Sequence, residues 1–263
     1  MLFRSGVDEP VRIVTPTFTR EMDYDVRGRA IRETDLASGM EPRSTRYVHD
    51  AAGNVTAVIA PDSRVTRYEY DALGRLSEVR DPLGAAVRYE YDDRDNLTAL
   101  VDPKGHRLRF DYDRSNRLTR EVRPLGQETS YLYDSRGRLV RKADPKNQAA
   151  LYVYDDAGRL AELRTYGAGD HANPVKTVTF THDRVGNLTG YDDGVTSARY
   201  EYDDAYRRIL EAVNYGEMEL ASATTWYRNG LKKSFTGPGG LTTHYTYDAA
   251  NRLQWVEIPG KGF

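Results

Sequence analysis

A short motif recurs along this chain at a nearly constant interval, and this repetition constrains the fold more than any other feature. Each copy is built on an aspartate that usually follows an aromatic residue. The shared aspartates are Asp25, Asp50, Asp71, Asp92, Asp113, Asp134, Asp155, Asp183, Asp203 and Asp248. Five consecutive intervals, from Asp50 to Asp155, are 21 residues each. Units this small pack on their neighbours rather than fold alone, so the sequence predicts a tandem array.

The unit between Tyr68 and Gly84 shows why the repeat predicts a β-hairpin. Aromatic and polar residues alternate up to Tyr70, which is the period of a strand with one buried face. Asp71 then begins a turn in which its side chain can accept backbone N–H bonds, and Gly74 can adopt a positive φ. The apolar residues of the return strand do not alternate cleanly, which indicates a β-bulge. The whole chain is therefore predicted to be all-β, with almost no helix.

The other units keep the same chemistry at the same places. Where the turn glycine is absent, Asp95, Asn116 and Asn251 replace it, and such residues tolerate positive φ best after glycine. Tyr206 is an exception to this pattern. We assign a structural role, in turns and hairpin packing, to Tyr70, Asp71, Gly74, Arg75, Tyr91, Asp92, Tyr112, Asp113, Tyr133, Asp134, Gly137, Arg138, Tyr154, Asp155, Gly158 and Arg159.

The pattern Y-x-Y-D-x-x-G-R-L, repeated at about 21 residues over residues 22–259, resembles the RHS/YD-repeat family. The resemblance implies tandem hairpins in a curled antiparallel ribbon that is part of a spiral shell, as in bacterial Rhs-type polymorphic toxins and toxin complexes. It also implies that the chain is a fragment of a longer protein whose shell encloses a C-terminal toxin and helps to deliver it. Flanking repeats, the toxin domain and components of a secretion machine would be its partners, outside the cell or on its surface.

Regularity of the motif divides the chain into three parts. Residues 1-21 precede the first complete unit, and residues 22-165 hold the regular repeats. Residues 166-263 hold degenerate repeats with a loop insertion at 166-175. In the most degenerate unit, Trp226–Leu231, we expect Arg228 to stand at the aspartate position.

Composition excludes several classes of protein. The 38 basic and 40 acidic residues nearly balance, which argues against a nucleic-acid-binding protein. The chain has no cysteine, so it contains neither disulfides nor thiolate metal sites. No apolar run is long enough to span a bilayer, and the first residues do not read as a signal peptide.

The residues that could carry chemistry are better explained by the repeat. Catalysis by paired carboxylates needs one pair in a special environment, whereas a repeat places every aspartate in the same one. His49 and His182 occupy the tyrosine position of the motif and are interpreted as aromatic replacements. We therefore expect no catalytic site, no cofactor and no metal ion.

Two other functions remain open from the sequence. A tyrosine-rich array at a cell surface could mediate adhesion or bind glycans, so carbohydrate is a candidate partner. A propeller-like enzyme is also conceivable, because six blades of two hairpins would need about this chain length. Propeller blades repeat at about 40 residues, however, whereas adjacent units here are alike at half that spacing.

Overall fold

The computed structural model describes residues 2–4, 10–15 and 18–258, and every regular element among them is a β-strand. All strand pairs are antiparallel and link strands that are neighbours in sequence. The predicted all-β class, built from tandem hairpins, is thereby confirmed. In this part of the chain no helix is long and apolar enough to cross a membrane.

The chain divides into two compact units, Met1–Glu128 and Thr129–Phe263. The first holds β1 (Leu2–Arg4), β2 (Pro10–Val14), β3 (Thr19–Tyr24), β4 (Ala30–Leu36), β5 (Arg43–His49), β6 (Val55–Ile59), β7 (Val65–Tyr70), β8 (Leu76–Arg80), β9 (Ala86–Tyr91), β10 (Leu97–Val101), β11 (Arg107–Tyr112) and β12 (Leu118–Val122). The second holds all but the first residue of β13 (Glu128–Tyr133) and continues with β14 (Leu139–Ala143), β15 (Ala149–Tyr154), β16 (Leu160–Tyr166), β17 (Pro174–His182), β18 (Leu188–Asp192), β19 (Ser197–Tyr202), β20 (Arg208–Asn214), β21 (Glu219–Trp226), β22 (Lys232–Thr236), β23 (Thr242–Tyr247) and β24 (Leu253–Glu257).

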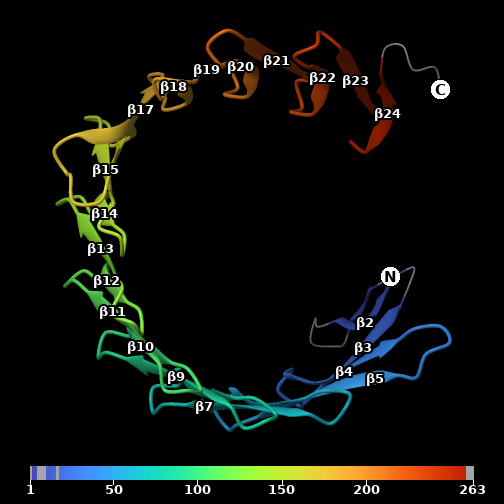
Figure 1. The fold of residues 1–263 in the computed structure, drawn as a ribbon. Helices are drawn as coiled ribbons and strands as arrows, with labels where there is room; N and C mark the ends of the chain where they lie inside the picture. The colour runs from blue at the N-terminus through green and yellow to red at the C-terminus, as the bar shows by residue number, and fades with distance from the viewer. Residues whose placement is uncertain (1, 5–9, 16–17, 259–263) are drawn as a thin grey trace. The chain divides into compact units, whose positions relative to one another are not determined.

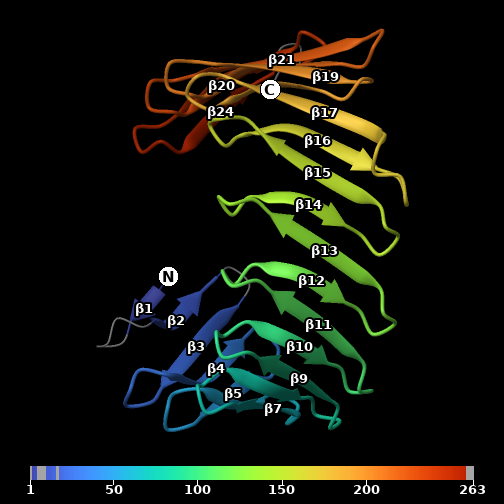
Figure 2. The same cartoon turned by 90° about the vertical axis from the view of Figure 1, so that its left-hand side faces the viewer.

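Within each unit the hairpins lie side by side in a single layer (Figure 1). Figure 2 shows this for β9 to β12 in the first unit and for β13 to β16 in the second, where each strand runs opposite to the one before. The loop that begins after Tyr166 replaces the short turn found in other units and ends where β17 begins at Pro174.

The first turn of each repeat has one hydrogen-bonding scheme, shown by the turn at Asp71. The Asp71 N–H donates to the Arg75 carbonyl at 2.9 Å, and the Gly74 N–H donates to the Asp71 carbonyl at 2.9 Å. Gly74 has a φ of 79°, which explains the glycine. Asp95, Asn116, Asn251 and also Tyr206 adopt the same left-handed conformation, with φ between 59° and 66°.

The bulge predicted in the return strand is confirmed. Tyr70 faces Leu76, but the preceding residue, Glu69, faces Glu78, so Ser77 is an extra residue on β8. The same shift of register recurs at the start of the return strands β10, β12, β14 and β16. A bulge removes a residue from the regular ladder, and its backbone groups then need other partners.

A single layer leaves little room for a hydrophobic core. The buried apolar residues in the described part are all small: Ala99, Ala143, Ala149, Ala198 and Ala212. No large side chain there is fully buried. The strand tyrosines are half-buried instead, with their rings against neighbouring strands and their hydroxyls free to bind polar groups. Cohesion between hairpins must therefore depend strongly on polar contacts.

Candidate functional site: the contacts that tie neighbouring repeats

The motif aspartate organises its own turn. Asp71 Oδ1 accepts the N–H of Leu73 and the N–H of Arg75, both at 2.9 Å. Its other oxygen, Oδ2, accepts from Arg75 Nε at 2.7 Å and lies 2.7 Å from Nη2, so the guanidinium binds side-on. The Arg75 backbone N–H and guanidinium together hold the pKa of Asp71 below its ordinary value.

The same arrangement recurs in the other units with arginine after the turn. At Asp25 the hydrogen bond from the Arg29 side chain is the main reason that the carboxyl pKa falls to about 2. Where asparagine follows the turn, as at Asn96, its amide Nδ2 donates to the carboxylate at 2.9 Å instead. The ionised aspartate is thus the favoured state in every such turn.

The motif arginine also reaches the next repeat. Arg75 Nη1 donates to the backbone carbonyl of Asp92 at 2.9 Å, and its guanidinium lies over the Tyr91 ring, 4.7 Å from the ring centre. We call this hydrogen bond to the next turn the forward tie. Forward ties of 2.5–3.0 Å also join Arg29 to Asp50, Arg159 to Asp183 and Arg207 to Tyr227.

The motif tyrosine reaches back to the previous repeat. Tyr91 Oη donates to the Leu76 carbonyl at 2.9 Å, and Leu76 stands at the bulge of the preceding hairpin. We call this bond the backward tie. It supplies a partner for a carbonyl at the irregular part of the ladder, while burial of the ring raises the pKa of Tyr91. Equivalent bonds of 2.8–3.0 Å join Tyr70 to Val55, Tyr112 to Leu97, Tyr154 to Leu139 and Tyr202 to Leu188.

The degenerate unit corrects one expectation and reveals a replacement. Tyr227, not Arg228, stands at the aspartate position, because its N–H donates to the Leu231 carbonyl and its own carbonyl accepts from Gly230. Trp226 therefore occupies the tyrosine position. Its indole Nε1 donates to the Arg208 carbonyl at 3.0 Å, which is the backward tie made by an N–H in place of an O–H.

At two junctions where one motif residue is replaced, one tie is lost and the other is kept. Asn54 is too short to reach the next turn and binds only its own aspartate, but Tyr70 still binds back across that junction. His182 stands at a tyrosine position, and there Arg159 supplies the forward tie. Arg138 is different: its Nη1 is buried without a hydrogen-bond partner, although the guanidinium lies over the Tyr154 ring.

The motif residues singled out from the sequence are placed in these turns and strands. Asp92, Asp113, Asp134 and Asp155 each accept N–H bonds from their own turns. Gly137 and Gly158 have φ of 83° and 85°. The residues do not converge on one centre within either unit. The carbonyl partners of the tyrosines and the role of Trp226 are not marked by the motif; the signal for them in the sequence is the recurring spacing of 15 residues from the tyrosine to the bulge in four of these bonds.

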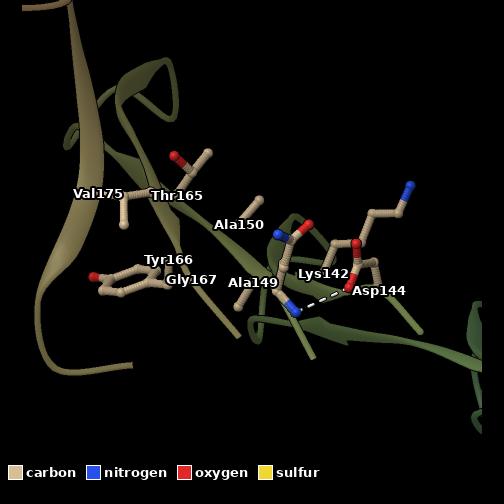
Figure 3. A pocket seen from close by; sticks show the side chains of 9 residues that line it. Lys142, Asp144, Ala149, Ala150, Thr165, Tyr166, Gly167 and Val175 are labelled. Carbon is tan, nitrogen blue, oxygen red and sulfur yellow. Dashed lines mark hydrogen bonds between the residues drawn. The ribbon is translucent and has the colours of Figure 1, made fainter. Parts of the chain in front are cut away.

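A shallow cavity of the second unit lies beside the inserted loop (Figure 3). It has a volume of about 480 Å³, and its apolar lining includes Ala149, Ala150 and Val175. Asp144 lines it but already accepts the Gln148 N–H at 2.9 Å, as the dashed line shows. Within the described ranges no three potential metal ligands gather in one place.

Comparison with known proteins places these repeats in a family. The Teneurin YD-shell profile matches residues 14–168, which is more than half of the chain, and an RHS repeat profile matches residues 226–258. No curated protein sequence matches the chain significantly.

Solved structures share the fold. A crystal structure of TcdB2-TccC3-Cdc42 is 17% identical, with a TM-score of 0.73 over 98% of this chain. A Photorhabdus luminescens Tc holotoxin pore is also 17% identical, with a TM-score of 0.71 over the same share. In both cases the chain spans only 16% of the length of the matched chain. The turns, ties and family profiles agree, and the chain belongs to the Teneurin YD-shell family.

Proposed function

We propose that this chain is a wall segment of an RHS/YD shell that encloses a C-terminal toxin and helps to deliver it. The observation that carries the proposal is the pair of ties between neighbouring hairpins. Arg75 and Tyr91 bind across one junction in opposite directions, so each hairpin is fixed to the next without a thick core. A single layer with such contacts suits a wall, because it encloses volume with few residues.

The role of the chain is structural rather than catalytic in this proposal. The ionised aspartates are held by their own turns, and the arginines that pair with them are occupied in the same contacts. The motif residues Tyr70, Asp71, Gly74 and Arg75, with their counterparts in sister repeats, therefore maintain the wall. Its partners would be flanking repeats, the enclosed toxin domain and components of a secretion machine. The complete protein would act outside the cell that makes it, or on its surface.

Protection of the enclosed domain tests the proposal. The full-length polypeptide that carries these repeats is treated with a protease, and cleavage of the domain that follows the repeats is compared with cleavage of that domain alone. Enclosure predicts cleavage at least about tenfold slower in the full-length protein, because cleavage then waits for the wall to open. Equal rates would contradict enclosure and leave the chain with a structural role only.

A glycan array probed with the same full-length protein separates the adhesion hypothesis from the shell. The shell proposal predicts no selective glycan. Selective retention of one glycan together with unprotected cargo would favour a cell-surface binding module instead.

A further inference from the structure

The second turn of several repeats has its own carboxylate cap. Asp81 Oδ1 accepts the N–H groups of Leu83 and Ala85 at 2.9 and 2.8 Å. Asp102 and Asp144 do the same for the residues two and four positions later, at 2.8–2.9 Å. Three sister turns thus show an anionic oxygen bound by two converging backbone N–H groups. Successive N–H groups in a turn form an anion-binding concavity of this kind.

The turn after β12 keeps this backbone but has exchanged the carboxylate for a cation. Arg123 stands at the aspartate position, with its N–H bound to the Gln127 carbonyl at 2.8 Å and its carbonyl accepting from Gly126 at 2.9 Å. Gly126 has a φ of 81°, as in the capped turns. The N–H groups of Leu125 and Gln127 correspond to those that bind Asp81, but no side chain in the described part of the chain accepts from them.

Other second turns without the aspartate do not combine these features. At the turn that begins with Ala60, Asp62 supplies a carboxylate that accepts the Arg64 N–H at 3.2 Å. The turn at Gly237 also lacks the carboxylate, but it brings no positive charge of its own. The repeat therefore does not require an arginine in place of the aspartate at position 123.

A cavity of about 350 Å³ lies beside this turn, and its lining is basic. Arg107, Arg109 and Arg123 line it together with His106 and Val122, and the lining contains no carboxylate. Arg107 is held by Glu90, and Arg123 Nε lies 3.6 Å from Glu121 Oε1. Arg109 pairs with no carboxylate among the described residues, so its guanidinium is available to a ligand.

We propose that the 123–127 turn and this cavity bind an oxyanion group of an external ligand, whether carboxylate, phosphate or sulfate. One oxygen of the ligand takes the place that Asp81 Oδ1 holds in its own turn and accepts the N–H groups of Leu125 and Gln127. Arg109 and Arg123 balance the charge of the ligand. Guanidinium groups bind oxyanions well because their N–H donors match the geometry of the acceptor oxygens.

Backbone amide shifts of the ¹⁵N-labelled chain test this site directly. The chain is titrated with inorganic phosphate, with sulfate and with acetate at constant ionic strength. We expect the amide resonances of Leu125 and Gln127 to shift until the site is saturated. The amide resonances of Leu83 and Ala85, whose N–H groups already bind Asp81, should not shift. Comparison of the three salts identifies which oxyanion the site prefers. Shifts at Leu125 and Gln127 no larger than those at Leu83 and Ala85 would overturn the proposal.

Substitution of Arg123 distinguishes a specific anion site from general attraction of anions to positive charge. Arg123→Asp recreates the capped sister turns, so it should fold and should weaken binding by about tenfold or more, because its carboxylate occupies both N–H groups. Arg109→Gln should weaken binding while the turn remains uncapped. Arg114→Asp makes the same change of charge in the neighbouring first turn and should leave the titration unchanged. An Arg123→Asp chain that titrates like the original would refute the site.

Discussion

Two junctions between neighbouring hairpins are stabilised by different side-chain contacts, although both have the same antiparallel backbone pairing. In the first unit, the junction between the turns at Asp71 and Asp92 has a forward tie from Arg75 and a backward tie from Tyr91. In the second unit, the junction between the turns at Tyr227 and Asp248 has no arginine at the motif position, because Leu231 stands there.

The degenerate junction uses other contacts. Tyr227 Oη donates to the Tyr245 carbonyl at 3.2 Å, and the Tyr227 and Tyr247 rings meet edge to face with their centres 6.2 Å apart. Asn229 Nδ2 donates to Asn251 Oδ1 at 3.1 Å. The hairpin therefore survives loss of the aspartate and the arginine together. The turn therefore needs its backbone geometry, whereas the motif side chains mainly decide how firmly neighbouring hairpins are joined.

The largest effect is expected when the degenerate pair is placed in the regular junction. Asp71→Tyr with Arg75→Leu removes the turn cap, the ion pair and the donor to the Asp92 carbonyl at once. We expect the thermal unfolding midpoint to fall by several degrees, because the turn loses its cap and ion pair and the half-buried Asp92 carbonyl loses its side-chain donor. Differential scanning calorimetry measures the change. A midpoint within a degree of the original would show that the motif pair adds little to cohesion.

The reverse exchange should have a smaller effect of opposite sign. Tyr227→Asp with Leu231→Arg installs a cap and an ion pair in the degenerate turn. It also removes the Tyr227 hydrogen bond and its ring contact with Tyr247. The net result should be a modest rise in the unfolding midpoint. A fall in the midpoint as large as that of the first exchange would mean that each junction depends on its own set of contacts, and that the motif pair does not stabilise the degenerate one.

Removal of a single backward tie should cost about 1 kcal/mol in the free energy of unfolding. Tyr91→Phe removes only the hydroxyl that donates to the Leu76 carbonyl, whereas Trp226→Phe also removes part of a ring that lies beside Arg207, so it should cost at least as much. Tyr89→Phe is the matched control, because no residue in the described ranges is hydrogen-bonded to that hydroxyl. Denaturant titrations compare the three. If Tyr89→Phe costs as much as Tyr91→Phe, the loss is not due to the tie.

Acid should loosen the regular turn and spare the degenerate one. The pKa of Asp71 lies below its ordinary value because Arg75 binds the ionised form. The stabilisation is therefore complete above the ordinary carboxyl range, near pH 4, and is lost as the pH falls through the lowered pKa. For Asp25 that midpoint lies at about pH 2.

Amide shifts followed from pH 6 to pH 1.5 check this smallest effect. The chemical shift of the Arg75 N–H should change as Asp71 is protonated, with a midpoint below the ordinary carboxyl range. The shift of the Leu231 N–H, in a turn without the aspartate, should show no such transition. An ordinary aspartate midpoint at Arg75 would contradict the contacts at Asp71.

Much of the fold follows from spacing alone. The 21-residue interval predicts the hairpins, the irregular apolar spacing in the return strand predicts the bulge, and the turn chemistry predicts the positive φ of Asn116. These features depend on residues close in sequence. The assignment of residues 166-263 as a degenerate part remains a prediction of the same kind.

The ties were not predicted because they depend on register between hairpins. Tyr91 needs a carbonyl at the bulge 15 residues earlier, and Arg75 needs the turn 17 residues later to lie beside it. Neither partner differs chemically from any other backbone carbonyl. Arg228 was expected at the aspartate position, where Tyr227 stands, for a related reason. Neither residue is an aspartate, so the motif does not mark the position, and only the backbone hydrogen bonds of the turn fix the register.

Hydrogen–deuterium exchange on an Arg75→Met chain tests the central claim, that side chains of one repeat hold the next. Arg75 belongs to the β7–β8 hairpin, but its forward tie ends on the turn of β9 and β10. The account predicts faster exchange in both hairpins, whereas Asn54→Ala, which removes a contact confined to its own turn, speeds exchange only there. Faster exchange limited to the Asp71 turn in the Arg75→Met chain would contradict the claim.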